Sequence, residues 1–138
     1  PAKGPPIMDD LHISLASAAL AALIALWLGA RCIAVRGRER IMHGDGGSVL
    51  LARRMRAQSN FAEYTPVALV LIVVLDLAGQ DGWALGTGAL AFMLGRMLHA
   101  VGMDADGDAW PRIAGMALTY ALLLGGAGWA LALAFGLI

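Results

Sequence analysis

The chain has 138 residues, of which 59% are hydrophobic and 14% are charged, and its mean hydropathy is +0.72. One domain with this composition is typical of a membrane protein. The net charge of zero gives no reason to expect a nucleic-acid partner, and the single cysteine, Cys32, excludes an internal disulfide and a multi-cysteine metal site.

The chain begins with a short segment, Pro-Ala-Lys-Gly-Pro-Pro, that we expect to be a remnant of cloning. Met8 is the expected native start, so residues 1–7 are set aside, and residues 8–138 are expected to form one four-helix transmembrane domain. Lys3 is the only lysine, and every other permanently charged cation is an arginine. Arginine presents a rigid fork of donors that suits carboxylates.

The first and fourth predicted helices are long apolar segments. Residues 11–30 contain no Asp, Glu, Lys or Arg, and about 20 such residues cross a bilayer as a helix. Residues 113–138 carry no charge, and the small residues at 125–128 suit close packing against another helix. Pro111 suits the first turn of this last helix, and Asp108 is a candidate cap before it.

The two middle helices are more polar. Residues 66–75 are strongly apolar but short, so the second helix is expected to begin near Ser48 and to include a polar stripe. Residues 83–103 form the third predicted span, and the short link at 77–82 predicts an antiparallel hairpin between these two spans. The sequence therefore predicts an all-α membrane protein, a bundle of four transmembrane helices.

Arginines are concentrated around one predicted loop. They are Arg36, Arg38, Arg40, Arg53, Arg54 and Arg56. The link at 77–82 has none. Cytoplasmic loops carry an excess of Lys and Arg, so we predict that this loop and the 104–110 loop face the cytoplasm, with both termini on the opposite side. The polar side chains of the second and third helices would then converge near the cytoplasmic face.

The polar stripe of the second helix is the main candidate site. At about 100° per residue, one helical face carries Arg53, Arg56, Asn60 and Glu63, whereas Gln58 points to the other side. Polar groups at membrane depth are costly, so they commonly face a protein interior or a wet cavity. Asn60 alone could equally form a hydrogen bond that joins two helices.

Arg96 and His99 lie one turn apart on the third helix, and Arg96 is the expected partner of a buried Glu63. This pair could join two helices, contribute to a binding site, or do both. Arg53 and Arg54 are expected to face solvent or lipid headgroups. No second histidine has a useful spacing to His99, so no metal site is expected.

These residues resemble a known family signature. The matching residues are Arg56-Ala57-Gln58-x-Asn60-x-x-Glu63-Tyr64-x-Pro66 and Arg96-x-x-His99. The pattern is similar to that of the MAPEG proteins, the membrane-associated proteins in eicosanoid and glutathione metabolism, and closest in form to the microsomal glutathione transferases and cysteinyl-leukotriene synthase. The resemblance implies a homotrimer that binds glutathione as co-substrate between neighbouring subunits, near the cytoplasmic side. The lipid bilayer would supply a lipophilic small molecule.

The resemblance also implies roles for individual residues. Those matching glutathione-binding positions, or completing that site, are Arg36, Arg56, Gln58, Asn60, Glu63, Tyr64, Arg96 and His99. Arg36 and Gln58 would act across the subunit boundary. Arg112 matches the arginine that stabilises the glutathione thiolate, since a nearby guanidinium lowers the pKa of a thiol. Met103 stands where many relatives have a tyrosine, and it cannot donate a hydrogen bond.

The sequence thus favours a membrane glutathione transferase, with glutathione peroxidase activity as a related option, in a bacterial inner membrane. Two alternatives stay open. A non-catalytic protein that binds lipid or glutathione would be consistent with Met103. A small proton-coupled drug transporter would use Glu63 as its coupling carboxylate, although the clustered arginines would repel cationic drugs.

Overall fold

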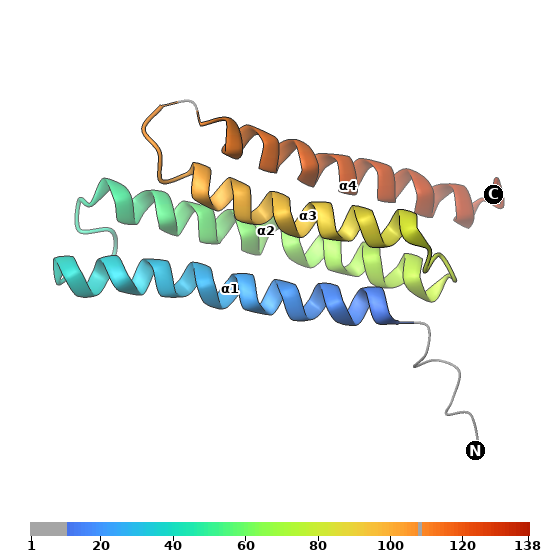
Figure 1. The fold of residues 1–138 in the computed structure, drawn as a ribbon, viewed down its shortest axis with the longest axis horizontal. Helices are drawn as coiled ribbons and strands as arrows, with labels where there is room; N and C mark the ends of the chain where they lie inside the picture. Colours follow the sequence, from blue (N-terminus) through green and yellow to red (C-terminus); the bar gives the residue numbers. More distant parts are fainter. Residues whose placement is uncertain (1–10, 108) are drawn as a thin grey trace, which may run out of the picture.

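The computed structural model describes residues 11–107 and 109–138, which form four long helices (Figure 1). The helices are α1 (His12–Glu39), α2 (Val49–Leu77), α3 (Trp83–Gly102) and α4 (Trp110–Ala134). Each of them is long and apolar enough to cross a membrane. The predicted all-α fold with four helices of membrane-spanning length is therefore confirmed. The N-terminal remnant expected at residues 1–7 and the cap expected at Asp108 lie outside the described residues.

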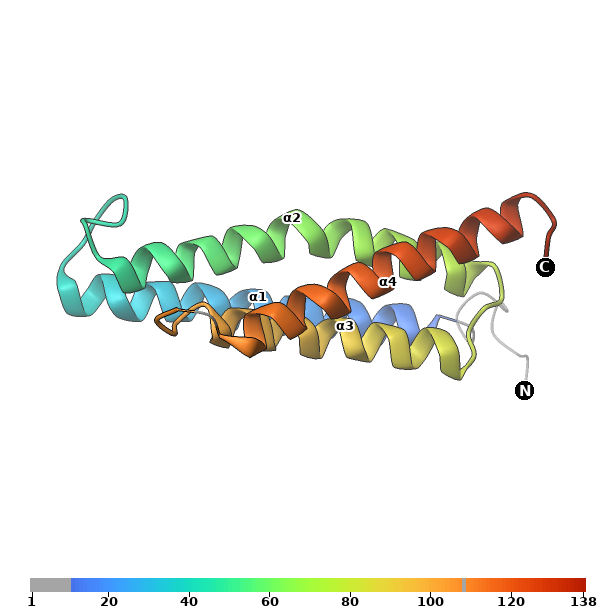
Figure 2. The same cartoon turned by 90° about the horizontal axis from the view of Figure 1, so that it is seen from above.

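The four helices lie side by side but do not form a closed bundle. α1, α2 and α3 pack against one another, and α4 packs on α2 and α3 (Figures 1 and 2). Within the described residues, α1 and α4 make no contact. The α1–α2 and α3–α4 loops lie together at one end of the molecule, which we call the arginine-rich end (Figure 1). This grouping of the two loops agrees with the predicted topology, and the side of the membrane that each end faces stays a prediction.

The ends of α1 and α2 follow from local sequence. Ser48 caps α2 as predicted, because its side chain accepts a hydrogen bond of 3.3 Å from the Leu51 amide. α1 continues beyond the apolar segment at residues 11–30 and ends only at Glu39. The next residue, Arg40, has a left-handed φ of 56°, and its amide donates to the carbonyl of an earlier turn. The arginines at the end of α1 are therefore helical.

The boundaries of α4 differ from the predicted span at residues 113–138. The helix begins earlier, at Trp110, because Pro111 suits its first turn as expected. It also ends earlier, at Ala134, since Gly136 has a φ of 65° that turns the chain out of the helix.

Glycines bring α3 and α4 into close contact at the arginine-rich half of the molecule. A methyl group added to Gly115 would lie 2.3 Å from the carbonyl oxygen of Gly95, and one added to Gly102 would lie 2.4 Å from a backbone nitrogen of α4. No side chain fits at these distances. Of the small residues expected to pack closely at 125–128, Gly126 does so, whereas Gly125 and Gly128 face open space.

The outer surface of the bundle is apolar. Exposed large hydrophobic side chains occur on all four helices, for example Leu26, Val70, Leu94 and Leu124. α4 is the least enclosed helix, since only 11% of its most apolar 18-residue stretch is buried. A surface of this kind requires lipid or another protein chain as its surroundings.

A buried carboxylate that sequence analysis missed joins α1 to α2 at the end opposite the arginines. Asp76 is 1% exposed, and its Oδ2 accepts hydrogen bonds from the Ser14 amide at 2.9 Å and the Ser14 hydroxyl at 2.5 Å. The Ser14 amide lies in the first turn of α1, where amides have no partner within the helix. Asp76 therefore caps α1 from a neighbouring helix.

Candidate functional site

A buried arginine joins three helices in the arginine-rich half of the molecule. Arg96 on α3 is 1% exposed. Its guanidinium donates hydrogen bonds to the Asn60 side-chain oxygen on α2 and, at 2.9 Å, to the Thr119 hydroxyl on α4. Thr119 in turn donates to the carbonyl oxygen of Gly115 at 2.9 Å. The predicted polar stripe of α2 thus meets the polar residues of α3 through Asn60.

The predicted pairing of Glu63 with Arg96 is wrong within this chain. Glu63 is half-exposed, and its carboxylate forms an ion pair of 3.3 Å with Arg56, two turns earlier on α2. Asn60 lies one turn before Glu63 on the inward side of α2, where it is buried and takes the place beside Arg96. The helical periodicity placed Asn60 and Glu63 on one broad face but did not show which of them turns inward.

Tyr64 and Tyr120 form a pair of phenols beside this network. The guanidinium carbon of Arg96 lies 5.9 Å from the centre of the Tyr64 ring, close enough for a cation–π contact. The Tyr64 hydroxyl lies 3.2 Å from the Tyr120 hydroxyl, and the two rings meet edge to face at 6.0 Å. Sequence analysis missed Tyr120. The available signal was that Thr119 and Tyr120 are the only hydroxyl-bearing residues in the apolar stretch 113–138.

His99 and Arg112 continue the site toward the arginine-rich end. His99 is buried, and its Nδ1 lies 3.3 Å from the carbonyl oxygen of Arg112, which occupies the first turn of α4. The side chains of Arg96, Arg112 and Arg56 all lie within electrostatic reach of this histidine. Sequence analysis placed these four residues in one site, and the structure brings them to the same region of α2, α3 and α4.

The positive charge of Arg96 is not balanced by a carboxylate of the described residues. Among the residues that the structure describes, the hydrogen-bond acceptors facing Arg96 are neutral, and no salt bridge involves it. Its Nε is buried and finds no hydrogen-bond partner in the same part of the chain. A buried cation without an anionic partner is strongly unfavourable, so Arg96 is the least balanced charge of this region in the described residues.

Comparison with known proteins agrees with this arrangement. The MAPEG family profile matches residues 14–132. The chain belongs to the MAPEG family. It is also similar to the inner membrane protein YecN of Escherichia coli strain K12 and to the YecN protein of the O6:H1 strain. Each is 30% identical over 112 residues, which cover 81% of this chain and 85% of the relative. The resemblance stated from the sequence signature is thereby confirmed.

Two expected site residues of this MAPEG chain lie on the α1 flank of the molecule, away from the Arg96 network. Arg36 approaches the Met55 sulfur at 3.5 Å, and its Nη1 is buried with no hydrogen-bond partner among the described residues. Gln58 is exposed, with its amide nitrogen near Gly29 of α1. The Tyr64 and Arg96 network contacts α4 instead, and α4 does not contact α1 in the described residues. One chain therefore does not bring all the expected residues together.

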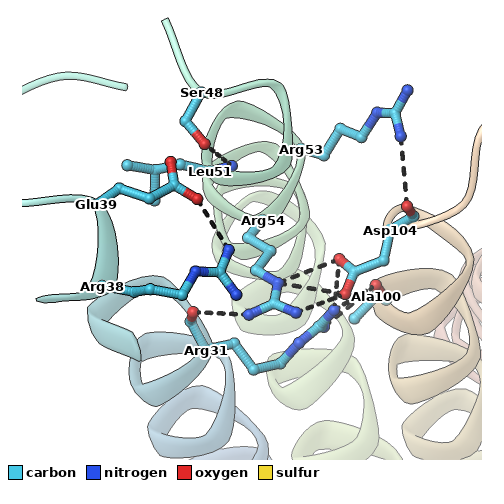
Figure 3. A network of polar contacts seen from close by, with 9 residues as sticks. All are labelled: Arg31, Arg38, Glu39, Ser48, Leu51, Arg53, Arg54, Ala100 and Asp104. Atoms are coloured by element: carbon cyan, nitrogen blue, oxygen red, sulfur yellow. Dashed lines mark hydrogen bonds and ion pairs between the residues drawn. The ribbon is translucent and has the colours of Figure 1, made fainter. Parts of the chain in front are cut away.

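An arginine clamp, formed by Arg31, Arg53 and Arg54 with Asp104 and Asp106, holds the α3–α4 loop at the arginine-rich end. Asp104 accepts from Arg31 at 2.7 Å and from Arg54 at 2.9 Å, and Figure 3 shows both guanidinium groups converging on it. Arg53 forms an ion pair of 2.7 Å with Asp106.

The clamp corrects the expectation that Arg53 and Arg54 face solvent or headgroups. Their side chains are only 29% and 21% exposed, because two aspartates of the α3–α4 loop lie close enough to pair with them. Sequence analysis gave no role to Arg31 or Asp104. Arg31 also packs over the Trp27 ring at 4.6 Å and donates to the carbonyl oxygen of Ala100.

An apolar groove between α2 and α4 begins next to the phenol pair. It has a volume of about 540 Å³, and its walls begin at Pro66 on α2 and at Leu123 on α4. These residues follow Tyr64 and Tyr120 by two and three positions. Polar and apolar surfaces thus adjoin at the two tyrosines. No group of three or more His, Cys, Asp or Glu side chains able to hold a metal ion occurs in residues 11–107 and 109–138.

Proposed function

We propose that the protein is a membrane glutathione transferase that joins the glutathione thiolate to a lipophilic electrophile. The observation that carries this proposal is the buried Arg96 guanidinium, which has neutral hydrogen-bond partners. Three arginines, Arg96, Arg112 and Arg56, lie within electrostatic reach of the neighbouring His99. Glutathione carries carboxylates and a thiol that ionises, so it has the negative charge that this region lacks. Membership of the MAPEG family supports the same assignment.

The proposed chemistry requires one activated sulfur and one electrophilic carbon. Arg112, in the first turn of α4, would stabilise the thiolate, while the thiol proton passes to water. The sulfur then forms a bond to the electrophilic carbon, and the leaving group departs with the bonding electrons. The adjoining apolar groove between α2 and α4 gives a lipophilic molecule a surface beside the polar site.

We further propose a homotrimer in the bacterial inner membrane. The separation of Arg36 and Gln58 from the Arg96 network supports an assembly, because a neighbouring chain would have to bring the α1 flank to the α4 flank. The exposed apolar face of α4 offers surface for such a contact. The similarity to an inner membrane protein supports the location. Glutathione would bind near the cytoplasmic face.

The direct test is conjugation of glutathione to an aryl chloride by the purified protein in detergent. We expect wild-type turnover, and we expect Arg112→Ala to lower kcat roughly 100-fold, a typical loss when one group that stabilises a developing anion is removed. Arg38→Ala is the matched control, since Arg38 is exposed and contacts only Glu39 in the described residues. Equal activity of the wild type and Arg112→Ala would exclude the thiolate role.

A second candidate function is non-catalytic binding of lipid or glutathione. Met103 favours it, because this residue packs against the apolar core formed with Ala100 and Phe92 and brings no hydroxyl to the site. Calorimetric binding of glutathione without turnover of aryl chlorides or lipid hydroperoxides would support this function over the transferase.

A further inference from the structure

The Tyr64–Tyr120 pair lies between the polar and the apolar parts of the site. On one side, Tyr64 covers the buried guanidinium of Arg96 at 5.9 Å. On the other side, the apolar groove between α2 and α4 begins within one helical turn of both tyrosines. An anionic co-substrate at Arg96 and a lipophilic molecule in the groove would therefore meet at these two phenols.

A hydrogen bond between two phenols uses one hydrogen and leaves the other free. The hydroxyl oxygens are 3.2 Å apart, so one tyrosine donates and the other accepts. If Tyr120 is the donor, the Tyr64 hydrogen stays available to an incoming anion. The received hydrogen bond also strengthens Tyr64 as a donor, because linked hydrogen bonds polarise one another.

We infer that Tyr120 is a positioning residue of the co-substrate site, which donates to Tyr64 and directs the Tyr64 hydroxyl hydrogen toward the bound anion. This inference rests on the proposed function, since the anion is taken to be glutathione. Ring packing alone does not require a hydroxyl at Tyr120, because phenylalanine would make the same edge-to-face contact. The hydroxyl of a half-exposed residue on a membrane-spanning helix needs a polar partner, and Tyr64 provides it.

The test is a double-mutant cycle on glutathione binding, measured by calorimetry with full-length protein in detergent. The variants are Tyr64→Phe, Tyr120→Phe and the double substitution. We expect Tyr120→Phe to weaken binding about threefold to tenfold, the effect of one hydrogen bond. We expect the double variant to bind no more weakly than Tyr64→Phe alone, because Tyr120 acts through Tyr64.

Thr87→Val is the matched control for removing a hydroxyl. Thr87 lies in the second turn of α3, and within the described residues its hydroxyl donates only to backbone carbonyls of the preceding turn. We expect this variant to bind glutathione as the wild type does. The unfolding temperature of each variant separates a loss of binding from a loss of folding.

The outcomes distinguish the inference from the function on which it rests. A wild-type protein that does not bind glutathione contradicts the proposed function. A wild type that binds, together with an unchanged Tyr120→Phe affinity, overturns only the role of Tyr120. Additive losses in the double variant would overturn it too, because the two hydroxyls would then act independently. A Tyr120→Phe variant with a lowered unfolding temperature and unchanged affinity would overturn it as well, because the hydrogen bond between the two hydroxyls would then stabilise only the fold.

Discussion

Substitution of Asp104 by asparagine tests whether the arginine clamp stabilises the fold. Asp104 is the anion for both Arg31 and Arg54, with contacts of 2.7 and 2.9 Å. The side chain of Asp104 is 28% exposed, and those of Arg31 and Arg54 are 13% and 21% exposed. These ion pairs are therefore intermediate between surface and buried ones. Breaking a buried pair costs about 3–5 kcal/mol and a surface pair about 0–1 kcal/mol. We therefore expect Asp104→Asn to lower the free energy of unfolding by about 2 kcal/mol.

The assay is reversible unfolding in mixed detergent micelles, followed by circular dichroism. A loss of about 2 kcal/mol corresponds to a change of roughly 30-fold in the unfolding equilibrium constant, which such a titration resolves. Asp106→Asn is the control, since Asp106 is 95% exposed and, in the part of the chain that the structure describes, pairs only with Arg53. We expect no measurable change for this variant. Equal stability of the two variants would refute the view that partial burial gives the clamp its strength.

Two further substitutions address the buried network and the glycine contact. Arg96→Met removes a buried charge with neutral partners, so we expect glutathione affinity to fall at least about tenfold while stability is kept or increased. A lower stability of this variant together with unchanged glutathione affinity would make Arg96 a structural link only. Gly115→Ala places a methyl group 2.3 Å from the Gly95 carbonyl oxygen, so we expect a lower unfolding temperature, whereas Gly125→Ala, which meets open space, should leave it unchanged. An unchanged Gly115→Ala protein would contradict the close contact of α3 and α4.

The number and order of the helices were predictable from the sequence, because long apolar segments have few alternatives to a membrane helix. The start of α2 was predictable as well, since Ser48 carries a recognisable capping side chain. The hydrogen-bond partner of Arg96 on α2 was not predictable from the sequence. Helical periodicity orders residues around one helix, but it does not give the rotation of that helix against its neighbours. For α2, that rotation is set by its packing against α1, α3 and α4 together.

The arginine clamp was missed for a related reason. Arg31 and Asp104 are 73 positions apart, and each resembles an ordinary charged residue near the end of a helix. They come together because the α3–α4 loop lies beside α1 at the arginine-rich end of the bundle. Tyr120 was missed because phenols are common at membrane interfaces and its spacing matches no signature.

The contact between Gly95 and Gly115 also restricts how a lipid-borne molecule can approach the buried arginine. At this level the backbones of α3 and α4 meet with no room for a side chain, so the seam between them is closed. The seam between α2 and α4 opens instead into the apolar groove that starts at Pro66 and Leu123. A hydrophobic molecule that approached from this groove would meet the two tyrosines before it came near Arg96.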